Sequence, residues 1–257
     1  MRPVPSALRR SVFHWAVGAL AGLTLAPAAF AQAPAYPSKP STIVVGYPPG
    51  GSTDLMGRMV GTELSNRLGQ PVVIENIGGA GGGIGAQKVA SAQPDGYTLL
   101  VGASNELAIN KLVTKKVKYD IKDFTAIGLV ASQPLVLVAS PASGVKNAAD
   151  FIQLVSKNPG KYSYGSSGVG TSLHLAGEML KSQGNLFMTH IPYRGVAPLT
   201  NDLVGGNLDY GVFVLSSGLP HIKSGKVIAL GTTEAKRSPI TPDIPALAES
   251  PQCRNVD

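Results

Sequence analysis

Two short loops carry the residue types that could hold an anion. The first, PPGGSTD at residues 48–54, follows a strand-like run and precedes a helical apolar pattern. A helix N-terminus leaves backbone N–H groups without partners, and its dipole favours negative charge. The two glycines let the backbone approach a ligand, while Ser52 and Thr53 can cap the helix or donate hydroxyl hydrogen bonds. The loop predicts an anion site or a plain helix cap, which Asp54 in the first turn also favours.

The second loop, GSSGVGTS at residues 165–172, also lies between a predicted strand and a predicted helix, in the other half of the chain. Ligands of open α/β sheets bind at the carboxyl ends of the strands. Two such loops, one from each half, could face each other across a cleft. The pair is a more specific signal than either loop alone.

Other chemical motifs are weak. In the run GGAGGGIGA (78–86), Gly81, Gly83 and Ala86 match a dinucleotide-binding spacing, but a tight loop packed against the other half of the chain is the better interpretation. His174, His190 and His221 lack metal-ligand spacing, and no G-x-S-x-G motif occurs. We therefore predict no metal, no cofactor and no enzyme activity, although a Ser-His-Asp triad stays open.

The elements that must position these loops alternate between strand and helix patterns, which indicates an α/β protein with largely parallel sheets. The first predicted strand, at 42–47, leads into an amphipathic helix from Leu55 that Gly69 ends. Thr171 and Ser172 can cap a second long helix. Further strands are predicted at 71–76, 96–104, 161–167, 187–194, 208–214 and 226–233.

The alternation suggests two similar lobes. The apolar run at 124–140 reads as two buried strands and contains the boundary between the lobes. We expect lobe 1 at 32–128, lobe 2 at 129–221, and a return to lobe 1 at 222–257.

The first 31 residues have the layout of a cleavable signal peptide, with a basic start, an apolar stretch and Ala29-Phe30-Ala31. Without the three arginines of this leader, 19 of the 22 basic residues remain against 15 acidic residues, a net charge of +4. That mild charge suits a small anionic ligand and falls short of a nucleic-acid-binding surface. The single cysteine, Cys253, leaves no internal disulfide, so the core must supply the stability.

The chain resembles the Bug family, also called the TctC family, the periplasmic solute-binding proteins of tripartite tricarboxylate transporters. The stretches that carry the resemblance run from Tyr36 to about Ser250, and are YPSKPSTIVVGYPPGGSTD, GQPVVIENIGGAGGGIGAQKVA, PDGYTLLVGAS, NPGKYSYGSSGVGTSLHLAGEML, HIPYRG and LPHIKSGKVIALGTTEAKRSP. The resemblance implies a two-lobed, type II Venus-flytrap protein with hinge strands between the lobes. It also implies a carboxylate ligand held between the two loops.

Carried over residue by residue, the resemblance implies nine ligand-binding positions. These are Tyr47, Gly51, Ser52 and Asp54 in the first loop, Ser104 after the third strand, Ser166, Ser167 and Thr171 in the second loop, and Tyr193 on the wall. Phe213 stands where several amino-acid-binding members carry an acidic residue, which predicts a ligand without an amino group.

The family implies further that the chain is a periplasmic monomer whose partners are the membrane subunits of the transporter or a sensor receptor. Two alternatives stay open, a periplasmic hydrolase on the same scaffold and a non-functional remnant. The second follows from the abrupt end PQCRNVD, since family chains run several dozen residues further, and we expect a C-terminal truncation.

Overall fold

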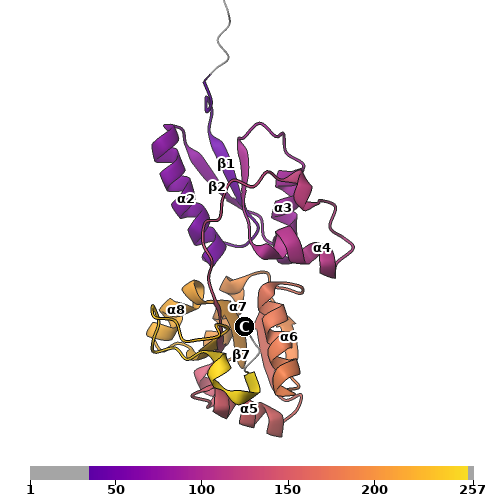
Figure 1. Ribbon diagram of the computed structural model, residues 1–257, viewed down its shortest axis with the longest axis vertical. Coiled ribbons are helices and arrows are strands. Elements are labelled where there is room, and N and C mark those ends of the chain that lie inside the picture. The colour runs from indigo at the N-terminus through magenta and orange to yellow at the C-terminus, as the bar shows by residue number, and fades with distance from the viewer. Residues whose placement is uncertain (1–34, 254–257) are drawn as a thin grey trace, which may run out of the picture. The chain divides into compact units, whose positions relative to one another are not determined.

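The computed structural model describes residues 35–253, and it divides into two compact units between Ser38 and Lys39. The expected signal peptide at 1–31 lies outside the described residues. The larger unit holds two sheets, each with its own helices (Figure 1). We call the part from β1 to η3 (41–123) the first lobe, and the part from β4 to η6 (135–253) the second lobe.

The first lobe is built on a parallel three-stranded sheet in the order β2-β1-β3. Its strands are β1 (Ser41–Val45), β2 (Val72–Asn76) and β3 (Thr98–Val101). The buried apolar residues of β1 are Ile43, Val44 and Val45, which form a continuous run as a parallel strand covered on both faces requires. The lobe also contains α2 (Ser52–Leu68), α3 (Gly83–Ala90), α4 (Asn110–Val113), a single π-helical turn η2 (Asn105–Ile109), and two 3-10 turns, η1 (Ala80–Gly82) and η3 (Ile121–Asp123).

Helix α2 approaches the sheet most closely at two glycines, with Val60 packing against the same core. A Cβ atom on Gly57 would lie 2.8 Å from Val45, and one on Gly61 would lie 2.8 Å from Ile74. Leu55 and Met59, part of the apolar stripe expected from the sequence, are exposed instead. Helix and strand approach closely only because these two positions lack side chains, and Gly69 ends the helix in the left-handed conformation as predicted.

The second lobe has five strands in the order β6-β5-β7-β4-β8. Strand β5 is parallel to β6 and β7, whereas β4 is antiparallel to β7 and β8. The strands are β4 (Leu135–Ala139), β5 (Ser163–Ser166), β6 (Thr189–Pro192), β7 (Tyr210–Val214) and β8 (Ile228–Thr232). The helices are α5 (Ala148–Lys157), α6 (Ser172–Gly184), α7 (Val196–Val204) and α8 (Leu215–Lys223), with 3-10 turns η4 (Pro141–Ser143), η5 (Leu247–Glu249) and η6 (Pro251–Cys253).

Helices cover both faces of this second sheet. Along β4, Val136 and Val138 pack with α7 and α8, while Leu137 and Ala139 pack with α5 and α6. Successive side chains of a strand point to opposite faces, so an all-apolar strand is what a doubly covered sheet requires. Cys253 is buried in the cluster on the α5 and α6 side, where burial raises the pKa of its thiol to about 11.

Two expectations about the path of the chain are wrong. The run at 124–140 contains one strand, β4, rather than two, because residues 125–131 lie exposed without a paired strand and only connect the lobes. The segment after residue 221 does not return to the first lobe within the described residues. Instead, β8 pairs with β4, and Leu247 and Cys253 bury themselves in the second core. The apolar residues of β8 and of the turns that follow it pack in the core clusters of the second lobe.

Within residues 35–253, no helix is both long and apolar enough to cross a bilayer.

Candidate functional site

A cavity of about 160 Å³ lies among loops from both lobes. The first lobe contributes Tyr47 and residues 79–82, and the second contributes residues 167–169 with Tyr193 and Arg194. The first-lobe residues follow the carboxyl ends of β1 and β2, and the second-lobe residues follow β5 and β6. This is the position at which α/β sheets hold ligands.

Tyr47 forms the first-lobe wall and its hydroxyl group is fully engaged. It donates to Oε2 of Glu106 at 2.8 Å and accepts from Nδ2 of Asn105 at 2.8 Å. Glu106 is 1% exposed and also accepts the backbone N–H of Ala103 at 2.7 Å. Burial raises the pKa of Glu106 to about 7, although these two hydrogen bonds favour its charged form. Burial also raises the pKa of Tyr47, so its hydroxyl keeps its proton.

The glycine-rich loop at 79–82 is pressed against this buried carboxylate. Four consecutive residues, Gly79 to Gly82, have positive φ angles of 131°, 50°, 58° and 87°. A Cβ atom on Gly82 would lie 2.6 Å from Oε2 of Glu106, so only glycine fits at that position. The loop also contacts the second lobe, since a Cβ atom on Gly81 would lie 3.2 Å from Thr171, as the tight-loop interpretation predicts. Its place in the cavity wall is a functional feature that the sequence interpretation missed.

The other predicted residues of the first loop hold the start of α2. Gly51 is the N-cap residue, without a side-chain cap from Ser52 or Thr53. Asp54 is 3% exposed and accepts hydrogen bonds from the Gly50 backbone, from Arg58 and from Asn76. Burial alone would raise the pKa of the Asp54 carboxyl, but the Arg58 and other hydrogen bonds outweigh it and hold the pKa below its usual value.

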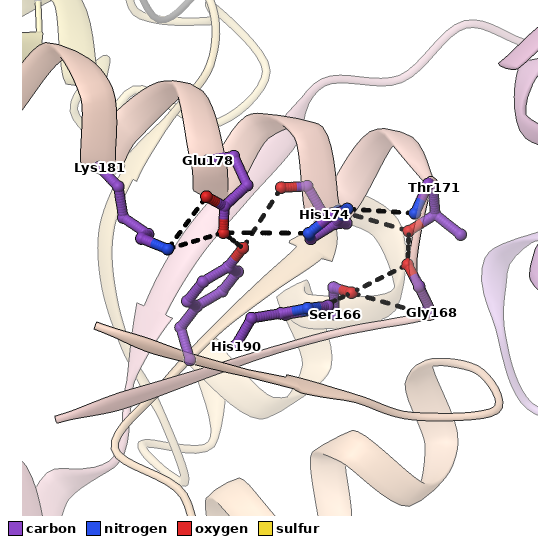
Figure 2. A network of polar contacts seen from close by, with 9 residues as sticks. Ser166, Gly168, Thr171, His174, Glu178, Lys181 and His190 are labelled. Atoms are coloured by element: carbon purple, nitrogen blue, oxygen red, sulfur yellow. Dashed lines mark hydrogen bonds and ion pairs between the residues drawn. The ribbon is translucent and has the colours of Figure 1, made fainter. Parts of the chain in front are cut away.

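The second-lobe loop at 166–171 is closed on itself. Thr171 Oγ1 donates to the Gly168 carbonyl at 2.8 Å and accepts the His174 backbone N–H, so it caps α6 as predicted. Ser166 Oγ bonds the backbone N–H and carbonyl of the same Gly168, each at 3.2 Å. These contacts of Ser166, Gly168 and Thr171 hold the loop in place (Figure 2). Ser167, in the same loop, lines the cavity.

A stacked pair of histidines supports this loop (Figure 2). The rings of His174 and His190 lie 4.2 Å apart, His190 Nε2 lies 2.7 Å from Ser166 Oγ, and His174 Nδ1 accepts the Gly170 backbone N–H at 3.1 Å. Burial, and then the neighbouring His174, lower the pKa of His190 to about 4. Burial also lowers the pKa of His174, so both rings are neutral near pH 7.

The two stacked histidines continue, away from the loop, into Tyr164, Glu178 and Lys181, and we call these five residues the histidine layer. The end of the layer away from the loop is charged. Glu178 Oε1 accepts the Tyr164 hydroxyl at 2.6 Å, and both of its oxygens bond Lys181 Nζ. Burial would raise the pKa of Glu178, but the bonds from Tyr164 and Lys181 outweigh it and lower the pKa. The layer therefore runs from a surface ion pair to the loop at the cavity.

Arg194 is the charged residue of the cavity wall, and sequence reasoning missed it. Its neighbour Tyr193 was predicted on the wall and lies there, but the Tyr193 hydroxyl donates to Asp202 at 2.7 Å. Burial first, and then Asp202, raise the pKa of Tyr193 to about 12. The signal for Arg194 was its place in HIPYRG, at the end of the strand predicted at 187–194.

The structure brings three of the nine predicted residues to the cavity, namely Tyr47, Ser167 and Tyr193. Ser166 and Thr171 lie fully buried behind Ser167, and Gly51, Ser52 and Asp54 form the start of α2. Ser104 immediately precedes η2. Phe213 is fully buried in the core among Val136 and Leu199, so the argument from Phe213 about an amino group loses its basis. In the described part of the chain, no group of three or more His, Cys, Asp and Glu side chains could hold a metal ion.

Comparison with known proteins gives a family for the chain. The family described as "Tripartite tricarboxylate transporter family receptor", TctC, matches residues 56–256. A relative from Pseudomonas sp. (strain P51), named "UPF0065 protein in tcbD-tcbE intergenic region", is 38% identical over 217 residues, which is 84% of this chain and 64% of the relative. The chain thus spans slightly less than two thirds of that relative's length.

Two solved structures are similar in fold. Rpa4515 of R. palustris, solved with adipate, has 34% identity and a TM-score of 0.82, covering 84% of this chain and 73% of its own. MatC (Rpa3494) of Rhodopseudomonas palustris, solved with bound malate, has 31% identity and a TM-score of 0.79, covering 84% and 74%. With two sheets, each covered by its own helices, and a cavity lined from both lobes, the chain belongs to the TctC family of two-lobed solute-binding proteins.

Proposed function

We propose that the chain binds a small organic carboxylate in the cavity between Tyr47 and Arg194, and that it delivers this ligand in the periplasm to the membrane subunits of a tripartite tricarboxylate-type transporter. The observation that carries the proposal is the composition of the cavity wall. One guanidinium, one serine and a glycine-rich loop leading into α3 surround a small space. Among the residues that the structure describes, no acidic side chain lines it.

Each part of this wall suits a carboxylate. A guanidinium presents several N–H donors in a planar fork that matches the two oxygens of a carboxylate. Ser167 adds a hydroxyl donor. Residues 79–82 lead directly into Gly83, the first residue of α3, and the dipole at this end of the helix favours an anion. The hydroxyls of Tyr47 and Tyr193 are committed to Glu106 and Asp202, so these two rings serve as walls.

Adipate and malate in the two solved relatives are dicarboxylates, which supports the same ligand class here. The protein would act as a monomer. A sensor receptor is an alternative recipient of the loaded protein.

The hydrolase alternative has one observation in its favour, the 2.7 Å contact between Ser166 Oγ and His190 Nε2. Ser166 is 0% exposed, however, and its hydroxyl is hydrogen-bonded to the backbone of Gly168. A nucleophile must reach its substrate. The contact is better explained as a support for the loop, so binding without turnover is the function we propose.

Thermal unfolding of the purified chain with adipate, malate, succinate and citrate tests this proposal. A ligand that binds only the folded state adds about 2.7 kcal/mol of stability at a hundred times its dissociation constant. We expect at least one acid to raise the midpoint, and Arg194→Gln to abolish that rise. Arg67→Gln removes an exposed arginine of α2 and is the matched control. A cooperative transition that no acid moves, or a shift that survives in Arg194→Gln, contradicts the proposed site.

A further inference from the structure

Asn105 joins the two lobes through a single side chain. It belongs to η2 of the first lobe and is 4% exposed. Its Oδ1 atom accepts the backbone N–H of Ser172 at 2.7 Å, and its Nδ2 atom donates to the Tyr47 hydroxyl at 2.8 Å. Ser172 is the first residue of α6 in the second lobe. One amide thus links the cavity wall of the first lobe to a helix start of the second.

The hydrogen bond from Ser172 completes a cap that the second lobe leaves unfinished. The first N–H groups of a helix have no partner within the helix. In α6, the side chain of Thr171 accepts the N–H of His174, and the N–H of Ser172 is accepted by Asn105. A helix of the second lobe is therefore capped partly by a side chain of the first lobe, and this cap exists only while the lobes are in contact.

The orientation of the Asn105 amide follows from the bonds around it. The Tyr47 hydroxyl has one hydrogen atom, which faces two acceptors, Glu106 Oε2 at 2.8 Å and the Gly81 carbonyl at 3.2 Å. The Tyr47 oxygen must therefore accept from Asn105, and only the amide nitrogen can donate. The amide oxygen is then left facing Ser172. A buried chain of hydrogen bonds runs from Glu106 through Tyr47 and Asn105 to the start of α6.

Near this hydrogen bond the two lobes also pack closely at glycine residues. A Cβ atom on Gly195 of the second lobe would lie 2.7 Å from Pro48, and one on Gly170 would collide with Val113. Lobe contact at these points needs glycine, so the lobes approach closely enough for the Asn105 bond to form.

We propose that Asn105 is an interlobe clasp, a positioning residue that favours the closed arrangement of the lobes by capping α6 from the first lobe. The clasp acts through the backbone of Ser172 and holds Tyr47 in the cavity wall at the same time. It does not depend on the proposed carboxylate ligand, because every bond in it lies within the chain.

The test measures the distance between the lobes without any ligand. Spin labels on Arg67→Cys in α2 and Gln153→Cys in α5 report this distance by double electron–electron resonance, since both positions are exposed and Cys253 is buried. Asn105→Ala removes the whole clasp. Ser172→Pro replaces the N–H with a ring carbon and removes the hydroxyl, and proline is tolerated at the first position of a helix. Ser172→Ala keeps the N–H and is the matched control.

We expect Asn105→Ala and Ser172→Pro to raise the ratio of separated to closed lobes about fivefold to tenfold, as the loss of one buried hydrogen bond implies. Ser172→Ala should keep the distance distribution of the parent chain. The proposal is overturned if Ser172→Pro leaves the distribution unchanged, or if Ser172→Ala opens the lobes as much as proline does. Ser172→Pro leaves the first lobe intact, so it decides the question even if Asn105→Ala disturbs the packing of Tyr47.

Discussion

The hydroxyl of Tyr47 donates a 2.8 Å hydrogen bond to Oε2 of Glu106 inside the first lobe, where the two residues are 8% and 1% exposed. This carboxyl group has a folded-state pKa of about 7, against an ordinary value of 4.5, because burial penalises its charged form. The folded chain therefore keeps a proton that the unfolded chain releases. Stability from this group is complete below pH 4.5 and is lost as the pH rises through 7.

Glu106→Gln should remove this pH dependence. The free energy of unfolding, measured by urea denaturation at intervals from pH 4.5 to 8, should decline less in the variant than in the parent chain. Glu63→Gln, which removes an exposed carboxylate of α2, shows how much a surface charge alone contributes. Parallel pH profiles for Glu106→Gln and the parent would show that the buried carboxyl is already ionised at pH 4.5.

The histidine layer under the second loop has the opposite dependence. The pKa of His190 is lowered from 6.5 to about 4, mainly by burial and next by His174, so the unfolded chain binds a proton that the folded chain does not. Stability should fall as the pH falls from 6.5 to 4. His190→Gln keeps a side chain that can bond Ser166, and its stability should fall less steeply over this range.

Chemical unfolding at pH 7, 6, 5 and 4 measures the effect of His190→Gln. His221→Gln, in α8 and outside the histidine layer, controls for the loss of an imidazole. If the two variants show the same slope between pH 6.5 and 4, the layer does not carry the acid sensitivity. Glu178 and Lys181 are charged neighbours of these rings, and salt screens their charges. The ionic strength is therefore held constant across the series.

Asp54 should matter for stability more than for ligand contact. Its carboxylate is buried and accepts hydrogen bonds from Gly50, Arg58 and Asn76, which join the loop before α2, α2 itself and β2. Asp54→Ala leaves these donors without their acceptor, which should cost about 2–3 kcal/mol. Glu63→Ala breaks an exposed pair with Arg67 and should cost less than about 1 kcal/mol. Equal losses in urea denaturation would contradict this role.

Gly177 lets α6 pack directly on β5. A Cβ atom at this position would collide with the ring of Tyr164, which is buried and held by its hydrogen bond to Glu178. Gly177→Ala should therefore destabilise the second lobe by about 1–3 kcal/mol, although alanine favours helices elsewhere. Gly128→Ala, in the segment that connects the lobes, is the control, because a Cβ atom added there would have no atom within 4 Å other than those of its chain neighbours. A thermal midpoint for Gly177→Ala equal to that of Gly128→Ala would show that the ring shifts freely.

The sequence by itself determined most of the elements and their order, although it predicted two strands at 124–140 where the structure has one. Strand and helix patterns, the Gly69 stop and the Thr171 cap act over a few residues, so local rules predict them. The same rules found both loops, because each follows a strand and precedes a helix. Tyr47, Ser167 and Tyr193, which all line the cavity, were instead implied by the family resemblance.

Only the tertiary structure decided what each polar side chain does. Ser166, Thr171 and Asp54 have the chemistry of ligand contacts, yet their partners are Gly168, His190, Arg58 and other residues of the same fold. Arg194 became a wall residue because β6 ends beside β5. The pairing of β8 with β4, and the bond between Asn105 and Ser172 across 67 residues, depend on contacts distant in the chain. Periodicity and spacing report the neighbourhood of a residue along the chain, whereas burial and hydrogen-bond partners depend on which segments meet in space.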